Sequence, residues 1–260
     1  MTRRFNALLL ALLLLLGVPY YWLLLDNRPD HIPPMPVHMA ELRQLAASQP
    51  GPLPESVGMV VVAHRLLPGN LIAAGSGMKR RNMGRIAFIL PIPGARPILI
   101  QPGKAIGPES GIRMDQHYPA FETQVARAGR KAALVLSSDG NTGTRAPHAL
   151  GPGVVAIPAP SHTPRSQMFF VRLANGAEYL FAGEIAPLAL SWRDQRGRAR
   201  LVSDWLVPED RHAVFAWLRT IRALKQEAPD LHVVPGYDHE WLADGRNRSG
   251  VRTDFSVSAN

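Results

Sequence analysis

Two stretches of the chain carry side chains that could do chemistry together. In APSHTPRSQMFF, His162 lies between a serine and a Thr-Pro turn, and in GAEYLFAGEIAPL a strand-like run ends at Gly183 and Glu184. An imidazole and a carboxylate are ligands that zinc accepts, and the same pair could act as a general base on water. A catalytic zinc site would need at least one further protein ligand, because such sites have three.

Composition limits this chemistry. The 260 residues include no cysteine, which excludes disulfides, thiolate catalysis and Cys-ligated zinc. The net charge is +9, with basic clusters at 79–81, 193–200 and 245–252. Aromatic residues do not interleave with these clusters as they do in stacking sites for nucleic acid, so we expect no nucleic-acid partner. We interpret the clusters as solvated loop surface, with attraction to anionic lipid as the alternative.

The N-terminal segment predicts a membrane anchor. Residues 7–25 carry no charge, and as a helix they would be roughly 28 Å long, close to the thickness of the bilayer's hydrocarbon core. Arg3 and Arg4 precede the run, so we expect a single pass with residues 1–6 in the cytoplasm and the domain on the periplasmic or extracellular side. The run ends in LLLDNRPD without a small-x-small cleavage site, which favours an uncleaved signal-anchor over a signal peptide.

Behind the anchor, the pattern predicts a linker and one layered domain. Residues 26–53 are rich in proline and indicate a spacer, interrupted by a short helix at 39–47. The domain is assigned to 54–245 and a C-terminal tail to 246–260. We expect strands at 57–64, 85–90, 97–101, 132–136, 154–157, 168–173, 178–182 and 231–234, and helices at 119–129 and 209–228. Strands first, then helices interleaved with strands, favour a layered α/β domain over an all-β barrel.

Four stretches, in this order, resemble the metallo-beta-lactamase superfamily. ILIQPG (98–103) and AALVLSSDGNTG (132–143) stand where the family has Asp-x-Gly and His-x-His-x-Asp-His. PAPSHTPRSQMFFVRLANGAEYLFAGEIA resembles the stretch with the third His and the bridging Asp, and EDRHAVFAWLRTIRALKQEAPDLHVVPGYDHEWL resembles the late helix and the strand ending in Pro-Gly-His-Asp. The resemblance implies an αββα sandwich with one or two zinc ions at one edge, and a hydrolase of ester, lactone or thioester bonds.

The chain departs from the family at most of the metal-ligand positions. The positions of the main His/Asp cluster fall on Ser138, Gly140, Thr142 and Gly143. None of these has an imidazole or a carboxylate, and Tyr237 stands in place of the last histidine. His162 is retained, and Glu184 stands where the resemblance places the bridging Asp. Two protein ligands rarely hold zinc against water, so we predict that the family's dinuclear site is absent.

Two hypotheses about function follow. We favour a non-catalytic domain that acts as a scaffold or binding module, with no cofactor; its partners would be the membrane, through residues 7–25, and an envelope protein or anionic lipid. The alternative is an active hydrolase with a rebuilt mononuclear zinc site, in which Asp238 and His239 join His162 and Glu184 as ligands. Without a metal, His162 and Glu184 could form a hydrogen-bonded pair that acts as a general base or only holds the loop.

Other polar residues near the expected cleft have less specific interpretations. Asp139 and His148 could also serve a rebuilt site, although a turn residue and a solvated histidine are the simpler readings. The serines at 137, 138, 161 and 166 lie nearby, but the chain has no G-x-S-x-G elbow, so a serine hydrolase is disfavoured.

Overall fold

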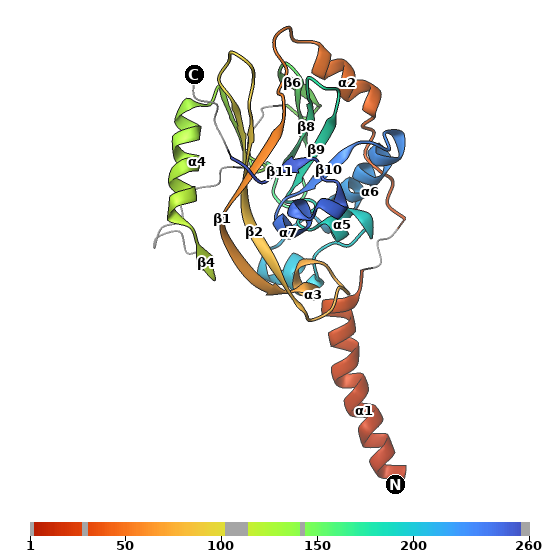
Figure 1. Cartoon of the computed structure of the whole chain (residues 1–260). Helices are drawn as coiled ribbons and strands as arrows, with labels where there is room; N and C mark the ends of the chain where they lie inside the picture. The colour runs from red at the N-terminus through yellow and green to blue at the C-terminus, as the bar shows by residue number, and fades with distance from the viewer. Residues whose placement is uncertain (1–2, 28–30, 102–113, 141–143, 256–260) are drawn as a thin grey trace.

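The computed structural model describes residues 3–27, 31–101, 114–140 and 144–255 (Figure 1). Thr142 and Gly143, two of the four positions of the family's ligand loop, lie outside the described residues.

The first sheet is built mainly from the N-terminal half of the domain, with one short strand from its C-terminal end. Its strand order is β11-β1-β2-β3-β5, and β4 pairs with β1. The strands are β1 (Val57–Pro68), β2 (Arg80–Leu90), β3 (Ile98–Ile100), β4 (Gln116–His117), β5 (Leu134–Leu136) and β11 (Val251–Arg252). β1 and β2 form a long antiparallel hairpin, whereas β3 runs parallel to β5 and β1 parallel to β11. The sequence patterns predict all of these strands except the two-residue strands β4 and β11.

The second sheet contains the later strands, in the order β10-β9-β8-β7-β6. The strands are β6 (His148–Gly151), β7 (Val154–Pro158), β8 (Gln167–Arg172), β9 (Glu178–Gly183) and β10 (His232–Pro235). β7, β8 and β9 are buried along almost their whole length. Such strands read as continuous apolar runs because both faces of their sheet are covered.

The two sheets pack face to face, with helices on both outer sides. Between the sheets lie Phe88, Phe169 and Phe181, and the rings of Phe88 and Phe181 meet edge to face with centroids 5.1 Å apart. Helix α4 (Pro119–Lys131) covers the first sheet through Val125 and Ala128. Helix α6 (Arg211–Glu227) covers the second sheet, so the order of layers is αββα (Figure 1). The α/β sandwich expected from the sequence is confirmed.

Short helices fill the loops between these layers. They are α3 (Gly69–Ile72), α5 (Ala189–Arg193), the π-helical turn η3 (Leu201–Leu206), α7 (His239–Ala243) and the 3-10 turn η4 (Gly245–Asn247). They follow no long amphipathic period, and the sequence patterns did not predict them.

Residues 31–53 pack on the domain instead of spacing it from the membrane. Helix α2 (Met39–Ala47) lies against the second sheet, close to α6 (Figure 1). Five residues of this segment belong to the same core cluster as α6: Ile32, Val37, Met39, Leu42 and Ala46. Glu227 accepts a hydrogen bond from the backbone amide of Met39 at 2.8 Å. The linker predicted for 26–53 is therefore corrected over this part, because its apolar side chains are buried in the core and the prolines only shape its path.

The C-terminal segment also contributes to the sandwich. The tail predicted for 246–260 is corrected up to Phe255, because β11 extends the first sheet and Phe255 is buried under α4. The five residues after Phe255 lie outside the described part of the chain.

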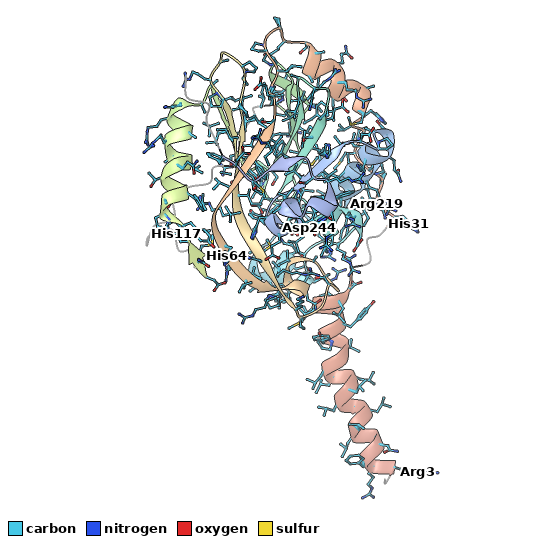
Figure 2. The ribbon with its side chains drawn as sticks, in the orientation of Figure 1. Arg3, His31, His64, His117, Arg219 and Asp244 are labelled. Carbon is cyan, nitrogen blue, oxygen red and sulfur yellow. The ribbon has the colours of Figure 1, made fainter. Side chains whose placement is uncertain are left out.

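The apolar N-terminal segment is a helix that projects away from the sandwich. Helix α1 (Arg3–Tyr20) continues into the π-helical turn η1 (Tyr21–Leu25), and together they are long and apolar enough to cross a membrane. No residue of α1 is buried in the molecule. Figure 2 shows Arg3 at its free end, far from the domain. At the other end, η1 adjoins the domain.

Candidate functional site

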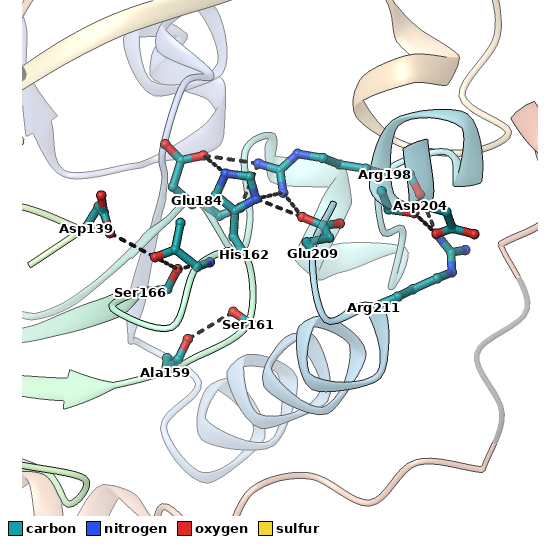
Figure 3. Close-up of polar contacts among 12 residues, drawn as sticks. Asp139, Ala159, Ser161, His162, Ser166, Glu184, Arg198, Asp204, Glu209 and Arg211 are labelled. Carbon is teal, nitrogen blue, oxygen red and sulfur yellow. Dashed lines mark hydrogen bonds and ion pairs between the residues drawn. The ribbon is translucent and has the colours of Figure 1, made fainter. Parts of the chain in front are cut away.

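The loop that carries His162 follows β7 and is fixed by its own hydroxyl groups. Ser161 Oγ donates to the carbonyl of Ala159 at 2.9 Å, and the Thr163 amide donates to Ser166 Oγ at 2.9 Å. The carbonyl of Ser161 also accepts a hydrogen bond from the Asp210 amide, just before α6. These bonds hold His162 at the edge of the second sheet, facing the start of α6 (Figure 3).

Glu184 is positioned by a glycine turn at the end of β9. Gly183 has a φ of +54°, a conformation that glycine adopts without strain. A Cβ on Gly183 would also lie 2.6 Å from Cβ of Ser138. The Gly-Glu pair at the end of this strand thus lets the carboxylate turn towards the loop of His162.

Two further residues complete the site, and both were missed from the sequence. Arg198 lies in the basic cluster 193–200, and Glu209 precedes Asp210, whose side chain caps α6 by accepting from the Ala213 amide. Arg211 Nη1 donates to the carbonyl of Arg198 at 2.6 Å, which fixes the backbone beneath the guanidinium group. An aspartate just before an apolar helical period marks a helix start, so Asp210 could have drawn attention to this position.

The four side chains form one ion network, which Figure 3 shows around the imidazole ring of His162. His162 Nδ1 lies 2.9 Å from Glu209 Oε2, and His162 Nε2 lies 3.7 Å from Glu184 Oε2. Arg198 connects the two carboxylates: Nη1 donates to Glu209 Oε2 at 2.5 Å, and Nη2 donates to Glu184 Oε2 at 3.1 Å. The hydrogen-bonded pair expected between His162 and Glu184 is therefore a loose contact within a larger network.

The ionised groups of this network are buried, so each charge needs a partner of opposite sign. The side chain of Glu209 is 1% exposed and that of Arg198 is 11% exposed. Burial raises the pKa of the Glu209 carboxyl, but the hydrogen bond from His162 and the positive charge of Arg198 outweigh it, so this pKa lies below its ordinary value. Glu209 is thus a carboxylate, and an ionised carboxylate only accepts hydrogen bonds. His162 Nδ1 must therefore carry the proton that it shares with Glu209.

This pKa shift predicts a specific dependence of stability on pH. A carboxyl group whose pKa is lowered by folding stabilises the protein above its ordinary pKa of 4.5, and this stabilisation is lost as the pH falls through the lowered pKa. We expect the difference in unfolding free energy between the wild-type protein and Glu209→Gln to be largest near neutral pH and to shrink below about pH 4.5. Chemical denaturation of both proteins over a pH series measures it. A constant difference would contradict an ionised Glu209.

The zinc that the resemblance implies does not fit these residues. Glu184 and Glu209 lie at opposite edges of the His162 ring, so they cannot both converge with one ring nitrogen on a single ion. The guanidinium group of Arg198, which is always protonated, already bonds both carboxylates and would repel a metal cation. Over the described residues, no group of three or more His, Asp or Glu side chains is arranged to hold a metal ion.

Asp238 and His239, the other proposed ligands, have contacts of their own near α7. Asp238 accepts hydrogen bonds from the amides of Ala189 at 3.0 Å and Trp241 at 3.4 Å, and burial raises the pKa of its carboxyl. His239 packs against Gly84, where an added Cβ would lie 2.4 Å from Nδ1. Burial lowers the pKa of His239, which favours a neutral ring. Asp238 thus bonds loop amides and caps α7.

The remaining candidates are engaged in local bonds. Asp139 accepts from Thr163 Oγ1 at 2.8 Å and pairs with Arg165 at 3.2 Å, so it holds the His162 loop. His148 Nδ1 lies 2.9 Å from Thr144 Oγ1. Tyr237, at the position of the family's last histidine, bonds through its backbone to Gly84 and Pro187.

No protein-family model and no curated protein sequence matches the chain. Solved structures do match it. A quorum-quenching N-acyl homoserine lactone hydrolase has a TM-score of 0.56 at 13% identity, covering 74% of this chain and 95% of that chain. An N-acyl homoserine lactone hydrolase with N-hexanoyl-L-homoserine at its catalytic metal center has a TM-score of 0.54 at 12% identity, covering 72% and 95%. A variant of B. thuringiensis AiiA with N-decanoyl-L-homoserine at its active site has a TM-score of 0.55 at 11% identity, covering 72% and 95%.

These comparisons show the fold of the chain. The chain has the αββα fold of the lactone hydrolases named above, which is the fold that the resemblance to the metallo-beta-lactamase superfamily implied. At these identities the likeness concerns the fold alone, so function must be argued from the site.

Proposed function

We propose that this protein is a membrane-anchored, exported domain with the metallo-beta-lactamase fold that works as a scaffold or binding module, not as a zinc hydrolase. The observation that carries the proposal is the guanidinium group of Arg198, which bonds Glu184 and Glu209 beside His162. Positive charge that the fold family obtains from metal is supplied here by a side chain of the chain itself. A guanidinium group has no open coordination position, so it cannot acidify a bound water as zinc does.

The anchored location is supported by the N-terminal helix. Within Arg3–Leu25, a window of 18 residues has a mean hydropathy of 2.3. Arg3 and Arg4 at its start favour an N-terminus in the cytoplasm and a domain on the other side of the membrane.

Metal content tests the proposal directly. We expect the full-length protein, purified in mild detergent, to contain zinc far below one ion per chain. Its melting temperature should not change with EDTA or added zinc, because only a ligand that binds the native state stabilises it. Elemental analysis and differential scanning fluorimetry measure both quantities.

The alternative function predicts the opposite results. Stoichiometric zinc, lost in His162→Ala together with the stabilisation by zinc, would overturn the proposal in favour of a rebuilt mononuclear site. Hydrolysis of an N-acyl homoserine lactone, the compound class named for the structural neighbours, would then be the first activity to assay. His31→Ala is the matched control, because this histidine is exposed and is none of the candidate ligands.

A further inference from the structure

An exposed apolar segment lies at the end of the domain from which the anchor projects. Trp205, Leu206 and Val207, in and just after η3, are 68%, 63% and 48% exposed. Three consecutive large apolar side chains left in water are unusual in a folded domain and indicate a surface that meets an apolar partner. We call this segment the apolar tip.

The apolar tip is joined to the last turn of the anchor by charged side chains. The guanidinium group of Arg200 lies over the ring of Trp22, 5.3 Å from its centroid, and Arg200 Nε lies 3.1 Å from Asp26 Oδ2. Arg200 also pairs with Asp204, the residue before Trp205, at 3.7 Å. One arginine thus connects the membrane-interface end of the anchor to η3.

Backbone contacts hold the same arrangement. Helix α3 contacts both η1 and η3, and the amide of Gly75 donates to the carbonyl of Leu24 at 3.2 Å. Asn27 Nδ2 donates to the carbonyl of Gln195, and Asn27 Oδ1 accepts from the amide of Gly197. The loops of the domain are therefore hydrogen-bonded to the end of the apolar helix and to Asn27, so the two parts are held together at this point.

A basic stretch lies at the same end of the molecule. Met78, Lys79, Arg80 and Arg81 are all exposed at the start of β2, and Met78 is 58% exposed. Backbone bonds from Gly69 to Lys79 and from Asn70 to Gly77 attach this stretch to α3. Figure 1 shows α3 and the adjoining end of the β1–β2 hairpin next to the point where α1 leaves the domain. We call residues 78–81 the basic hairpin end.

We propose that the apolar tip and the basic hairpin end form a second membrane contact, which docks the domain on the surface of an anionic bilayer beside its own anchor. This inference rests on the proposed anchoring. Tryptophan prefers the membrane interface, and Trp22 at the end of the apolar helix and Trp205 on the neighbouring turn would lie at this level together. Lysine and arginine at the hairpin end would meet anionic head groups.

A lipid surface fits this patch better than a protein partner does. The patch is continuous with the end of a helix long enough to span the bilayer, so the anchor itself brings it to the lipid surface. Its charged residues at the hairpin end are all basic, which complements anionic head groups. Binding at the two points would also fix how the domain is oriented above the membrane.

The absence of cysteine makes the test direct, because a single introduced cysteine can be labelled in the full-length chain. Leu206→Cys carries an environment-sensitive fluorophore on the apolar tip. Gln44→Cys, on the exposed face of α2 at the opposite end of the domain, is the matched control (Figure 1). Leu14→Cys, in the middle of α1, reports whether the anchor inserts. Each protein is reconstituted into phosphatidylcholine vesicles with and without phosphatidylglycerol, and quenching by spin-labelled lipid is measured.

We expect blue-shifted emission and strong lipid quenching at position 206, stronger in the anionic vesicles, and no quenching at position 44. If position 14 is quenched while position 206 behaves like position 44, the second contact is overturned and the anchoring stands; the apolar tip would then be open to a protein partner. If position 14 is not quenched, the anchoring itself fails. Equal quenching at 206 in both vesicle types would overturn the role of the basic hairpin end.

Discussion

Replacing Arg198 by alanine is expected to lower the free energy of unfolding by about 3–5 kcal/mol, the range measured when one partner of a buried ion pair is removed. The variant would leave the carboxylate of Glu209, which is 1% exposed, with His162 as its remaining partner among the described residues. The other carboxylate oxygen of Glu209, Oε1, is already buried and has no hydrogen-bond partner among the described residues. Chemical denaturation in mild detergent, followed by circular dichroism, measures the loss.

Arg165→Ala is the matched control for this effect. Arg165 also pairs with a carboxylate, that of Asp139 at 3.2 Å, but its side chain is 63% exposed. An exposed pair of this kind contributes about 0–1 kcal/mol, so this variant should be nearly as stable as the wild-type protein. If both variants lost the same free energy of unfolding, the buried network around His162 would contribute no more to stability than an exposed ion pair. Glu209→Gln in the Arg198→Ala background should restore part of the stability, because the unpaired charge is then removed.

Leu42→Ala is expected to destabilise the domain by about 2–5 kcal/mol, as for other leucine truncations in a packed core. Leu42 is 0% exposed and lies in the core cluster that α2 shares with α6 and the second sheet. Truncating its side chain would leave a cavity under α2. Thermal and chemical denaturation of the full-length protein measure the effect.

Gln44→Ala, on the exposed face of the same helix, is the control and should change the stability by no more than about 0.5 kcal/mol. A spacer that only separates the domain from the membrane would tolerate both substitutions. If Leu42→Ala were as stable as Gln44→Ala, the packing of residues 31–53 on the domain would be contradicted.

The candidate site places one guanidinium group between two carboxylates and an imidazole ring. Two carboxylates and an imidazole at the edge of a sandwich need positive charge between them, because buried like charges repel each other. Arg198 supplies that charge with fixed hydrogen-bond geometry, and Arg211 holds its backbone in place. The network fixes the loops of His162, Glu184 and Glu209 relative to one another, as the scaffold function that we propose requires.

Some features of this protein can be predicted from short stretches of its sequence, whereas others depend on the tertiary structure. The N-terminal helix could be predicted because its apolar run is uncharged over the length that a membrane span needs. The buried strands and the long helices were visible as apolar runs and periods, and the His162 and Glu184 positions followed from a resemblance that the fold confirms.

What the sequence could not give is the set of contacts between segments far apart in the chain. Arg198 and Glu209 meet His162 only because α6 and the loop before it fold against the second sheet, so a basic loop that looks solvated becomes the charge centre of the site. Residues 31–53 look like a proline-rich spacer, since their burial depends on contacts with α6 and the second sheet that exist only after folding. Local patterns determine which segments are helices, strands or anchors, whereas the partners of each charge and each apolar face are fixed by packing.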